Sequence, residues 1–141
     1  MRKILFDINV LLDVLLDRKP HVTASARIWA AAETGAVQGL LAAHALTTIH
    51  YLVSREKGSA TAGRIVAAIL SVMDVARVDA EVIRAALALS WPDFEDAETA
   101  AAAAAAGCSF IVTRDLAGFA HSPVEAVTPE TAAALLSNTQ P

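Results

Sequence analysis

The chain has 141 residues, of which 55% are hydrophobic, and its formal net charge is −4 at pH 7. This length suits one domain with a substantial core, and no apolar run reaches the ~18 residues that a membrane span requires. The negative charge argues against a protein that coats nucleic acid through many phosphate contacts, but it is compatible with a nuclease that reaches phosphate through bound cations.

We expect a single domain over residues 1–136, followed by a frayed tail at residues 137–141. The single cysteine, Cys108, cannot form an internal disulfide, and the acid at Asp7 comes too early for a signal peptide. A cytoplasmic protein without a membrane span is therefore expected.

Apolar runs alternate along the chain with segments of helical period. Ile4–Phe6 and Phe110–Thr113 show no polar alternation, which is typical of strands covered on both faces of a parallel sheet. The expected strands cover residues 4–6, 37–41, 75–78, 110–113 and 124–127. The expected helices cover residues 9–16, 20–34, 44–57, 59–73, 80–90, 93–106 and 129–136, with the third and fourth paired as a hairpin. This alternation predicts an α/β fold with a parallel sheet and right-handed crossovers.

Carboxylates stand directly after the two most apolar strands. Asp7 follows the first strand, and Asp115 follows the strand that ends at Thr113. Ligands of open α/β sheets bind outside the carboxyl ends of the strands, so these two acids converge if their strands are neighbours. Asp96 begins the helix that leads into the second strand and so returns to the same edge. Because carboxylate oxygens suit Mg²⁺ and Mn²⁺, the three acids predict a metal site.

Each of these acids also has a plain structural interpretation. Asp7 and Asp115 are placed to cap the helix or turn that follows them. Asp93 stands three residues before Asp96, as in a helix cap, and acids in a first turn are favoured by the helix dipole alone. Only the three acids together favour a site. Three further acids are expected outside it: Asp13 and Asp17 as solvated groups on a helix surface, and Asp79 as a helix cap.

Three segments, in this order, resemble the PIN-domain ribonucleases, particularly the VapC-like toxins of toxin-antitoxin pairs. They are Asp7-Ile-Asn-Val-Leu-Leu-Asp13, Asp93-Phe-Glu-Asp96-Ala97 before an alanine-rich helix, and Ile111-Val-Thr-Arg-Asp115 with Phe119 following. The resemblance implies a three-layer α/β/α sandwich with a central parallel sheet, and an endoribonuclease that uses Mg²⁺ or Mn²⁺. It implies that Asp7, Asp96 and Asp115 are the catalytic, metal-holding acids. By the same resemblance Asn9 and Thr113 support them, and the protein forms a homodimer that a small antitoxin silences.

The sequence departs from the family pattern early in the third helix, where the family usually has a glutamate. The matching position is His50, and no acid lies between Glu33 and Glu56. Histidine is a poorer ligand for Mg²⁺ but suits softer transition ions. We hypothesise that Asp93 supplies the missing carboxylate, because residues three apart share a helix face. The alternative is that His50 only packs against the helical hairpin.

Two other functions compete with a ribonuclease. One is a catalytically inactive binding module with the same fold, in which the acids are only caps. The other is a haloacid-dehalogenase-like phosphatase, because Phe6-Asp-Ile-Asn-Val-Leu-Leu and Thr113 resemble its first two motifs. That class needs a later lysine, and the chain has none after Lys57. The basic residues we expect near an RNA backbone are Arg55, Lys57, Arg64 and Arg114.

Overall fold

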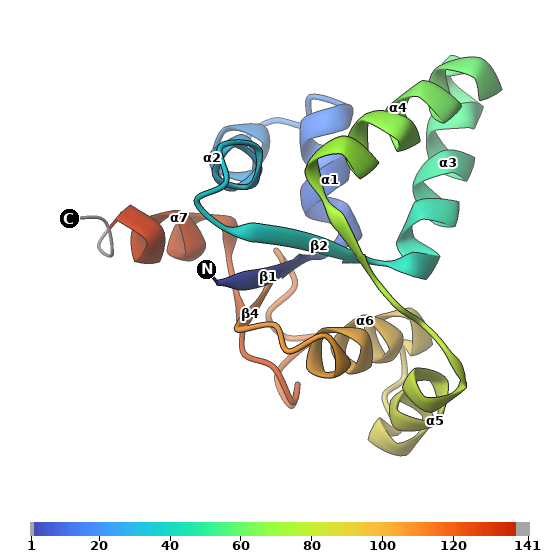
Figure 1. Ribbon diagram of the computed structural model, residues 1–141, viewed down its shortest axis with the longest axis vertical. Helices are drawn as coiled ribbons and strands as arrows, with labels where there is room; N and C mark the ends of the chain where they lie inside the picture. The colour runs from blue at the N-terminus through green and yellow to red at the C-terminus, as the bar shows by residue number, and fades with distance from the viewer. Residues whose placement is uncertain (1, 138–141) are drawn as a thin grey trace.

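The structure is a computed structural model and describes residues 2–137. Within this range five parallel strands form one sheet in the order β3-β2-β1-β4-β5 (Figure 1). The strands are β1 (Lys3–Phe6), β2 (Gln38–Ala42), β3 (Asp74–Ala76), β4 (Phe110–Val112) and β5 (Ala126–Val127). The helices are α1 (Ile8–Leu15), α2 (Val22–Glu33), α3 (Ala43–Lys57), α4 (Ser59–Val72), α5 (Ala80–Leu89), α6 (Phe94–Ala105) and α7 (Pro129–Ser137).

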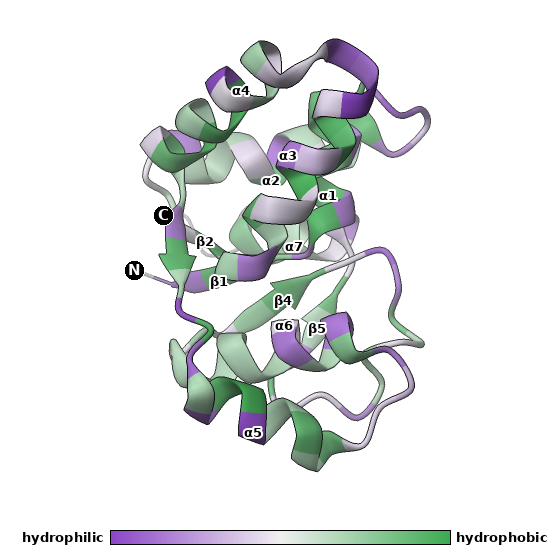
Figure 2. Cartoon of the chain, turned by 90° about the vertical axis from the view of Figure 1, so that its right-hand side faces the viewer, coloured by the Kyte–Doolittle hydropathy of each residue, from purple (hydrophilic) through white to green (hydrophobic). Residues whose placement is uncertain are grey.

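Helices cover both faces of the sheet, so alternate residues of a strand enter different cores. Ile4 and Phe6 of β1 pack in the core that is closed by α1, α2, α3, α4 and α7. Leu5, between them, packs in the second core, beneath α5 and α6. Figures 1 and 2 show these layers, with the largely hydrophobic strands between them. The predicted three-layer α/β/α sandwich and its parallel sheet are confirmed.

The strand order reverses at β1, and this reversal creates the crevice that positions the site. The chain runs from β1 outward to β2 and β3, then crosses back to place β4 and β5 on the other side. β1 pairs directly with β4, with Phe6 opposite Val112. Crossovers that leave the two central strands in opposite directions open a crevice at the carboxyl ends of those strands. Asp7 and Asp115 both follow these ends, as the sequence predicts.

The alanine run explains how close α6 lies to the sheet. Ala97, Ala100, Ala102 and Ala103 are all fully buried. Alanine is the best helix former and has no bulk beyond Cβ, so the helix forms readily and approaches the strands closely. The start of α6 is thereby held against the carboxyl edge of the sheet. No helix in the described part of the chain combines the length and the apolarity needed to cross a membrane.

One predicted surface acid is in fact part of the core. Asp13 is fully buried, and its carboxylate accepts hydrogen bonds from Arg114 Nε at 2.8 Å and Nη2 at 3.0 Å, and from Ser25 Oγ at 3.1 Å. The prediction of a solvated Asp13 is therefore wrong, because α1 packs beside α2, and Ser25 of α2 and Arg114 after β4 both bond to Asp13. Asp17 is exposed as predicted, at the end of α1.

Asp79 caps α5 as predicted, since its Oδ1 accepts a hydrogen bond from the backbone N–H of Val82 at 3.0 Å.

The C-terminal end of the chain largely follows the predicted pattern. Ser137, the first residue of the predicted tail, is the last residue of α7. The rest of that tail, residues 138–141, lies outside the described residues.

Candidate active site

Asp7 is the most buried of the predicted site acids, with 5% of its surface exposed. It is the N-cap of α1, where its Oδ1 accepts a hydrogen bond from the backbone N–H of Ile8 at 2.9 Å. Its Oδ2 accepts one from the hydroxyl of Thr113 at 2.9 Å. The cap interpretation of Asp7 is thus correct, but a cap alone does not require burial. Two donors fix both oxygens of this carboxylate in orientation.

Thr113 connects Asp7 to the segment that carries Asp115. Its buried hydroxyl donates to Asp7 and accepts from the backbone N–H of Asp115 at 3.0 Å. The Asp115 side chain closes a turn by accepting from the backbone N–H of Gly118 at 3.0 Å. One hydroxyl therefore ties the ends of β1 and β4 together and sets the positions of both acids.

Asp96 meets Asp115 in front of Gly118. A Cβ placed on this glycine would lie 2.5 Å from Asp115 Oδ2 and 3.2 Å from Asp96 Oδ2. The two carboxylate oxygens therefore face the same small space, which exists because residue 118 has no side chain. Asp96 stands in the first turn of α6, where the N-cap Asp93 accepts from its backbone N–H at 3.1 Å.

The electrostatics of this crevice disfavour the charged carboxylates. Burial raises the pKa of Asp7, against the opposing effect of its bonds to Thr113 and Ile8. Burial, together with the negative charges of Asp93, Asp7 and Asp115, raises the pKa of Asp96 to about 7. Carboxylates whose pKa is raised by burial and by neighbouring acids mark a candidate functional site. A bound cation would remove this repulsion.

The residues present fit a hard divalent cation. Among residues 2–137 no three His, Cys, Asp or Glu side chains lie close enough together to form a cage for a metal ion. Mg²⁺ rarely needs such a cage, because it keeps several waters and is usually held by one or two carboxylates plus substrate phosphates. Asp96 and Asp115 supply two oxygens that face one space, and the buried Asp7 interacts electrostatically with both. This is an open, oxygen-only donor set.

Comparison with known proteins places the chain in a family. A family model described as the PIN domain matches residues 3–117, which include Asp7, Asp96 and Asp115. The chain belongs to the PIN domain family. No curated protein matches its sequence.

Solved structures show the same fold at low sequence identity. VapBC2 from Rickettsia felis, bound to a promoter DNA fragment, is 14% identical with a TM-score of 0.70, over 89% of this chain and 98% of that chain. VapC20 from Mycobacterium tuberculosis, a sarcin-ricin loop cleaving toxin, is 19% identical with a TM-score of 0.66, over 83% and 93% of the two chains. DNA-bound VapBC from Salmonella typhimurium is 17% identical with a TM-score of 0.67, over 92% and 99%. At these identities the likeness establishes a shared fold.

In this PIN domain the structure separates His50 from the acids. His50 is exposed on α3 and lines a hollow with Leu46, Ser54 and Val66, on the side of α3 that faces α4. His44, at the start of the same helix, lies instead against α6. Its Nδ1 is 3.6 Å from Glu98 Oε2, and its Nε2 is 3.5 Å from the Thr99 hydroxyl.

The remaining predicted residues lie at the margin of the site. Asn9 is exposed, and its Oδ1 accepts a long hydrogen bond of 3.5 Å from Arg18 Nη1. Asp93 is exposed and lines the same hollow as Asp96 and Asp115, with one oxygen engaged in the α6 cap. Asp93 therefore lines the same hollow as Asp96 and Asp115, whereas Asn9 is hydrogen-bonded to Arg18.

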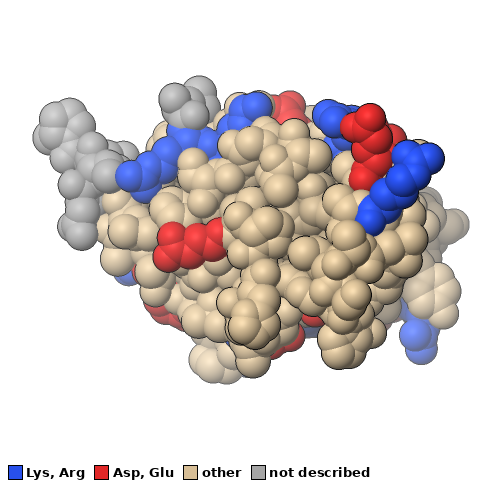
Figure 3. Space-filling model, turned by 90° about the horizontal axis from the view of Figure 1, so that it is seen from below, with Lys and Arg blue, Asp and Glu red and all other residues tan. Residues whose placement is uncertain are grey.

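The predicted RNA-contacting basic residues are not equivalent. Arg114 is hydrogen-bonded to the buried Asp13, so its role is structural. Arg55 lies 5.7 Å from the ring of Tyr51, and Arg64 donates to the hydroxyl of Thr61 at 3.1 Å. The face that carries α5 has its Lys and Arg side chains near the rim (Figure 3). That face does not offer a broad basic surface to RNA.

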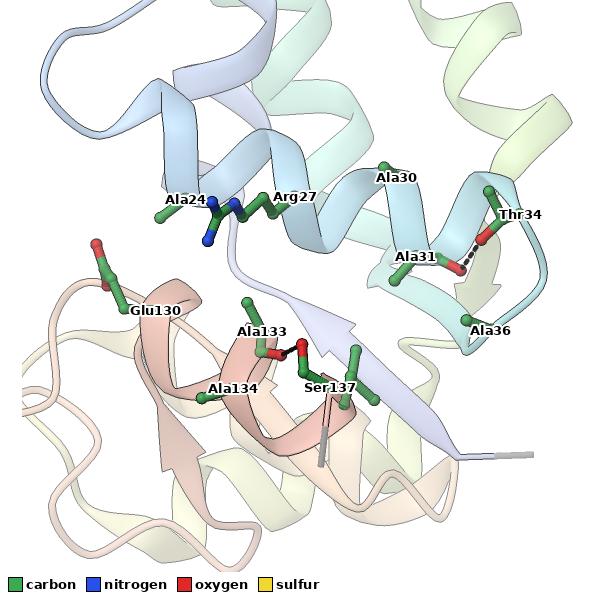
Figure 4. A pocket seen from close by; sticks show the side chains of 11 residues that line it. Ala24, Arg27, Ala30, Ala31, Thr34, Ala36, Glu130, Ala133, Ala134 and Ser137 are labelled. Carbon is green, nitrogen blue, oxygen red and sulfur yellow. Dashed lines mark hydrogen bonds between the residues drawn. The ribbon is translucent and has the colours of Figure 1, made fainter. Parts of the chain in front are cut away.

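A larger hollow lies away from the acids, between α2 and α7 (Figure 4). Its volume is about 630 Å³, against about 340 Å³ for the hollow that contains Asp96 and Asp115. Alanines form most of its wall, and Arg27 and Glu130 are its charged side chains. We assign the chemistry to the smaller hollow, because converging polar groups rather than volume mark a site.

The acidic hollow also contains two rings that sequence reasoning did not assign to it. They are Trp91 and His121. Their sequence signals were weak, because each stands alone in a loop. The glycine at position 118 was missed for the same reason, although it stands three residues after a predicted site acid.

Proposed function

We propose that this PIN domain is a Mg²⁺- or Mn²⁺-dependent endoribonuclease that hydrolyses RNA phosphodiester bonds, and that it is the toxin of a toxin-antitoxin pair. The observation that carries the proposal is the convergence of Asp7, Asp96 and Asp115 where the strand order reverses. Burial and neighbouring acids raise the pKa of Asp7 and of Asp96, and the nearby Arg114 is committed to Asp13. Membership of the PIN domain family and the likeness to VapC structures support the same function.

Asp7, Asp96 and Asp115 would hold the ion, and a bound ion of this kind lowers the pKa of a water and stabilises the charge that develops on a phosphodiester. The chain's own residues prepare the acids for this. Thr113 and the backbone N–H of Ile8 orient Asp7, and the backbone N–H of Gly118 orients Asp115. The glycine also leaves open the space that these carboxylates face. Orientation before binding lowers the cost of assembling the site.

Asp93 is proposed as a fourth carboxylate that replaces the glutamate missing from the third helix. It lines the hollow of Asp96 and Asp115 and contributes to the raised pKa of Asp96. Asp93→Asn keeps an effective N-cap residue, since Asn caps helices as well as Asp. If this variant kept full metal affinity and full cleavage, Asp93 would be only a cap.

The proposed partners are an RNA substrate, a second copy of the chain and a small antitoxin. The support is that the similar structures include VapBC assemblies and a toxin-antitoxin complex from Klebsiella pneumoniae. Light scattering of the purified protein tests the dimer. A chain that stays monomeric at high concentration would remove the dimer from the proposal without affecting the nuclease.

The function is tested by cleavage of a mixed RNA pool in Mg²⁺ or Mn²⁺, with and without EDTA. Asp7→Asn and Asp115→Asn should each lower the rate by more than about 100-fold, since even outer-shell partners of a metal cost 10–100-fold. Asp17→Asn is the matched control: it removes the same charge at an exposed position with φ 49°, which asparagine tolerates.

Two results would contradict the nuclease. Cleavage that survives EDTA or Asp7→Asn would come from a contaminant or from another site. No cleavage by folded protein in either metal would favour the inactive binding module, in which loss of the third-helix glutamate has removed activity. The phosphatase alternative has lost its basis, because the chain is a PIN domain.

A further inference from the structure

The hollow at Asp96 and Asp115 contains two ring side chains that metal binding does not use. Trp91 comes from the loop between α5 and α6, and His121 comes from the segment after β4. The hollow has a volume of about 340 Å³, near the lower end of the ~300–1,000 Å³ typical of small-ligand sites. It therefore has room for one planar group beside the acids.

The Trp91 side chain is fixed before any ligand arrives. It packs edge-to-face against Phe119, with ring centroids 5.8 Å apart and an interplanar angle of 88°. Phe119 is buried, so it provides a rigid support, while Trp91 is half-buried and lines the hollow. Ser90, with φ 56°, and Pro92 restrict the backbone on either side. An aromatic group ordered in advance loses little conformational entropy when a partner stacks on it.

Small residues complete the wall of the hollow. Ala117, Gly118 and Ala120 contribute no side chain beyond Cβ. No bulky group therefore competes with a ring that enters next to Trp91. A hollow lined by an indole, an imidazole, small residues and carboxylates offers rings that suit a base and carboxylates that suit a cation-bound phosphate. A nucleotide has the same two-part chemistry.

We propose that Trp91 and His121 bind the base of one unpaired nucleotide next to the scissile phosphate. This proposal rests on the proposed ribonuclease function and names the part of the substrate that the site reads. Unstacked bases in RNA are commonly recognised by stacking on aromatic side chains, whereas bases inside a duplex are unavailable for it. His121, which is exposed, lies where its ring contacts the same base.

The test is rapid-mixing fluorescence of Mn²⁺-loaded protein with a short single-stranded RNA and with the same sequence as a duplex. The chain has two tryptophans, so Trp29→Phe leaves Trp91 as the reporter and Trp91→Phe leaves Trp29. Trp29 lies on α2 in the other helical layer, which makes it a matched control. Emission should be quenched at once by the single strand in wild type and in Trp29→Phe, and not in Trp91→Phe.

Affinity provides a second readout. Trp91→Ala should weaken binding of the single strand about tenfold, which is within the range found when a stacking platform is replaced by alanine. Trp91→Phe should keep most of the affinity, because a ring remains. Ala120→Leu should weaken binding similarly by filling the hollow without touching Trp91. Both Trp91 variants should keep the wild-type rise in melting temperature on adding Mn²⁺, which shows that fold and metal site are intact.

The proposal fails if quenching persists in Trp91→Phe, if Trp91→Ala binds as tightly as wild type, or if the duplex binds as well as the single strand. Cleavage is scored separately on the same samples. Cleavage without any Trp91 effect would remove the base-binding site and keep the ribonuclease. Quenching without cleavage would keep the site and remove the ribonuclease.

Discussion

Asp13 and Asp7 are both buried carboxylates of the α1 region, but their surroundings are opposite. Asp13 accepts two hydrogen bonds from Arg114 and one from Ser25, so its charge is compensated within the chain. Asp7 accepts from a hydroxyl and a backbone N–H only, and it faces the like charges of Asp96 and Asp115. The comparison teaches that burial of an acid does not identify its role. What identifies it is whether the chain supplies the opposite charge.

The largest effect we predict comes from breaking the ion pair between Asp13 and Arg114. Arg114→Ala leaves the Asp13 carboxylate buried and unpaired, which should lower the free energy of unfolding by ~3 kcal/mol or more. Urea denaturation measures this loss. Arg64→Ala, at an exposed helix position, is the control and should change stability by less than ~0.5 kcal/mol. A loss below ~1 kcal/mol for Arg114→Ala would mean that water replaces the arginine at Asp13.

The next prediction concerns the space between the uncompensated acids. Gly118→Ala places a Cβ 2.5 Å from Asp115 Oδ2 and 3.2 Å from Asp96 Oδ2, so these carboxylates must move. We expect roughly tenfold weaker Mn²⁺ binding by calorimetry, comparable to the effect of disturbing a metal site's supporting shell. Gly63→Ala is matched to it, because nothing lies within 4 Å of its Cβ in α4. It should stabilise the fold by ~0.5–1 kcal/mol and leave Mn²⁺ binding unchanged. Equal metal binding in both variants would place the ion elsewhere.

The smallest predicted effect is a gain in stability when an acid, Asp96, is replaced. Burial and neighbouring acids raise the pKa of Asp96 from 3.8 to about 7, so the folded chain holds this proton more tightly than the unfolded chain does. Its contribution to stability is therefore present below pH ~4 and is lost as pH rises from about 4 to about 7. Without metal, Asp96→Asn should become more stable than wild type over this range, by ~1 kcal/mol after solvent screening.

Melting temperatures measured from pH 4 to pH 8 test this sign. Saturating Mn²⁺ should reverse the order at pH 8, because only wild type then gains the full stabilisation by the ion. A variant less stable than wild type in EDTA at pH 8 would show that Asp96 has a compensating partner.

Local sequence signals predicted the parts of the site that depend on strand ends and helix starts. Asp7 and Asp115 follow buried strands and Asp96 begins a helix, so topology brings them to one edge once β1 and β4 pair. The capping role of Asp79 was equally predictable from the sequence, because a cap depends on residues close in sequence.

Partners distant in sequence could not be predicted in this way. The bond between Asp13 and Arg114 depends on how α1 packs next to the end of β4. The sequence also does not show which side of α3 faces the site. His50 was therefore predicted at the position of the missing glutamate, whereas the structure places it towards α4 and places His44 against Glu98. Trp91 lines the hollow and packs against Phe119, a contact that no local sequence pattern predicts.

The most direct test of the central claim is a Mn²⁺ titration followed by melting temperature, on wild type, Asp7→Asn and Asp17→Asn. If the uncompensated acids form a cation site, Mn²⁺ raises the melting temperature of wild type and of Asp17→Asn in parallel, and Asp7→Asn does not respond, because only a ligand of the folded state stabilises it. An equal rise in all three proteins, or in none, would contradict the assignment of the metal to Asp7, Asp96 and Asp115.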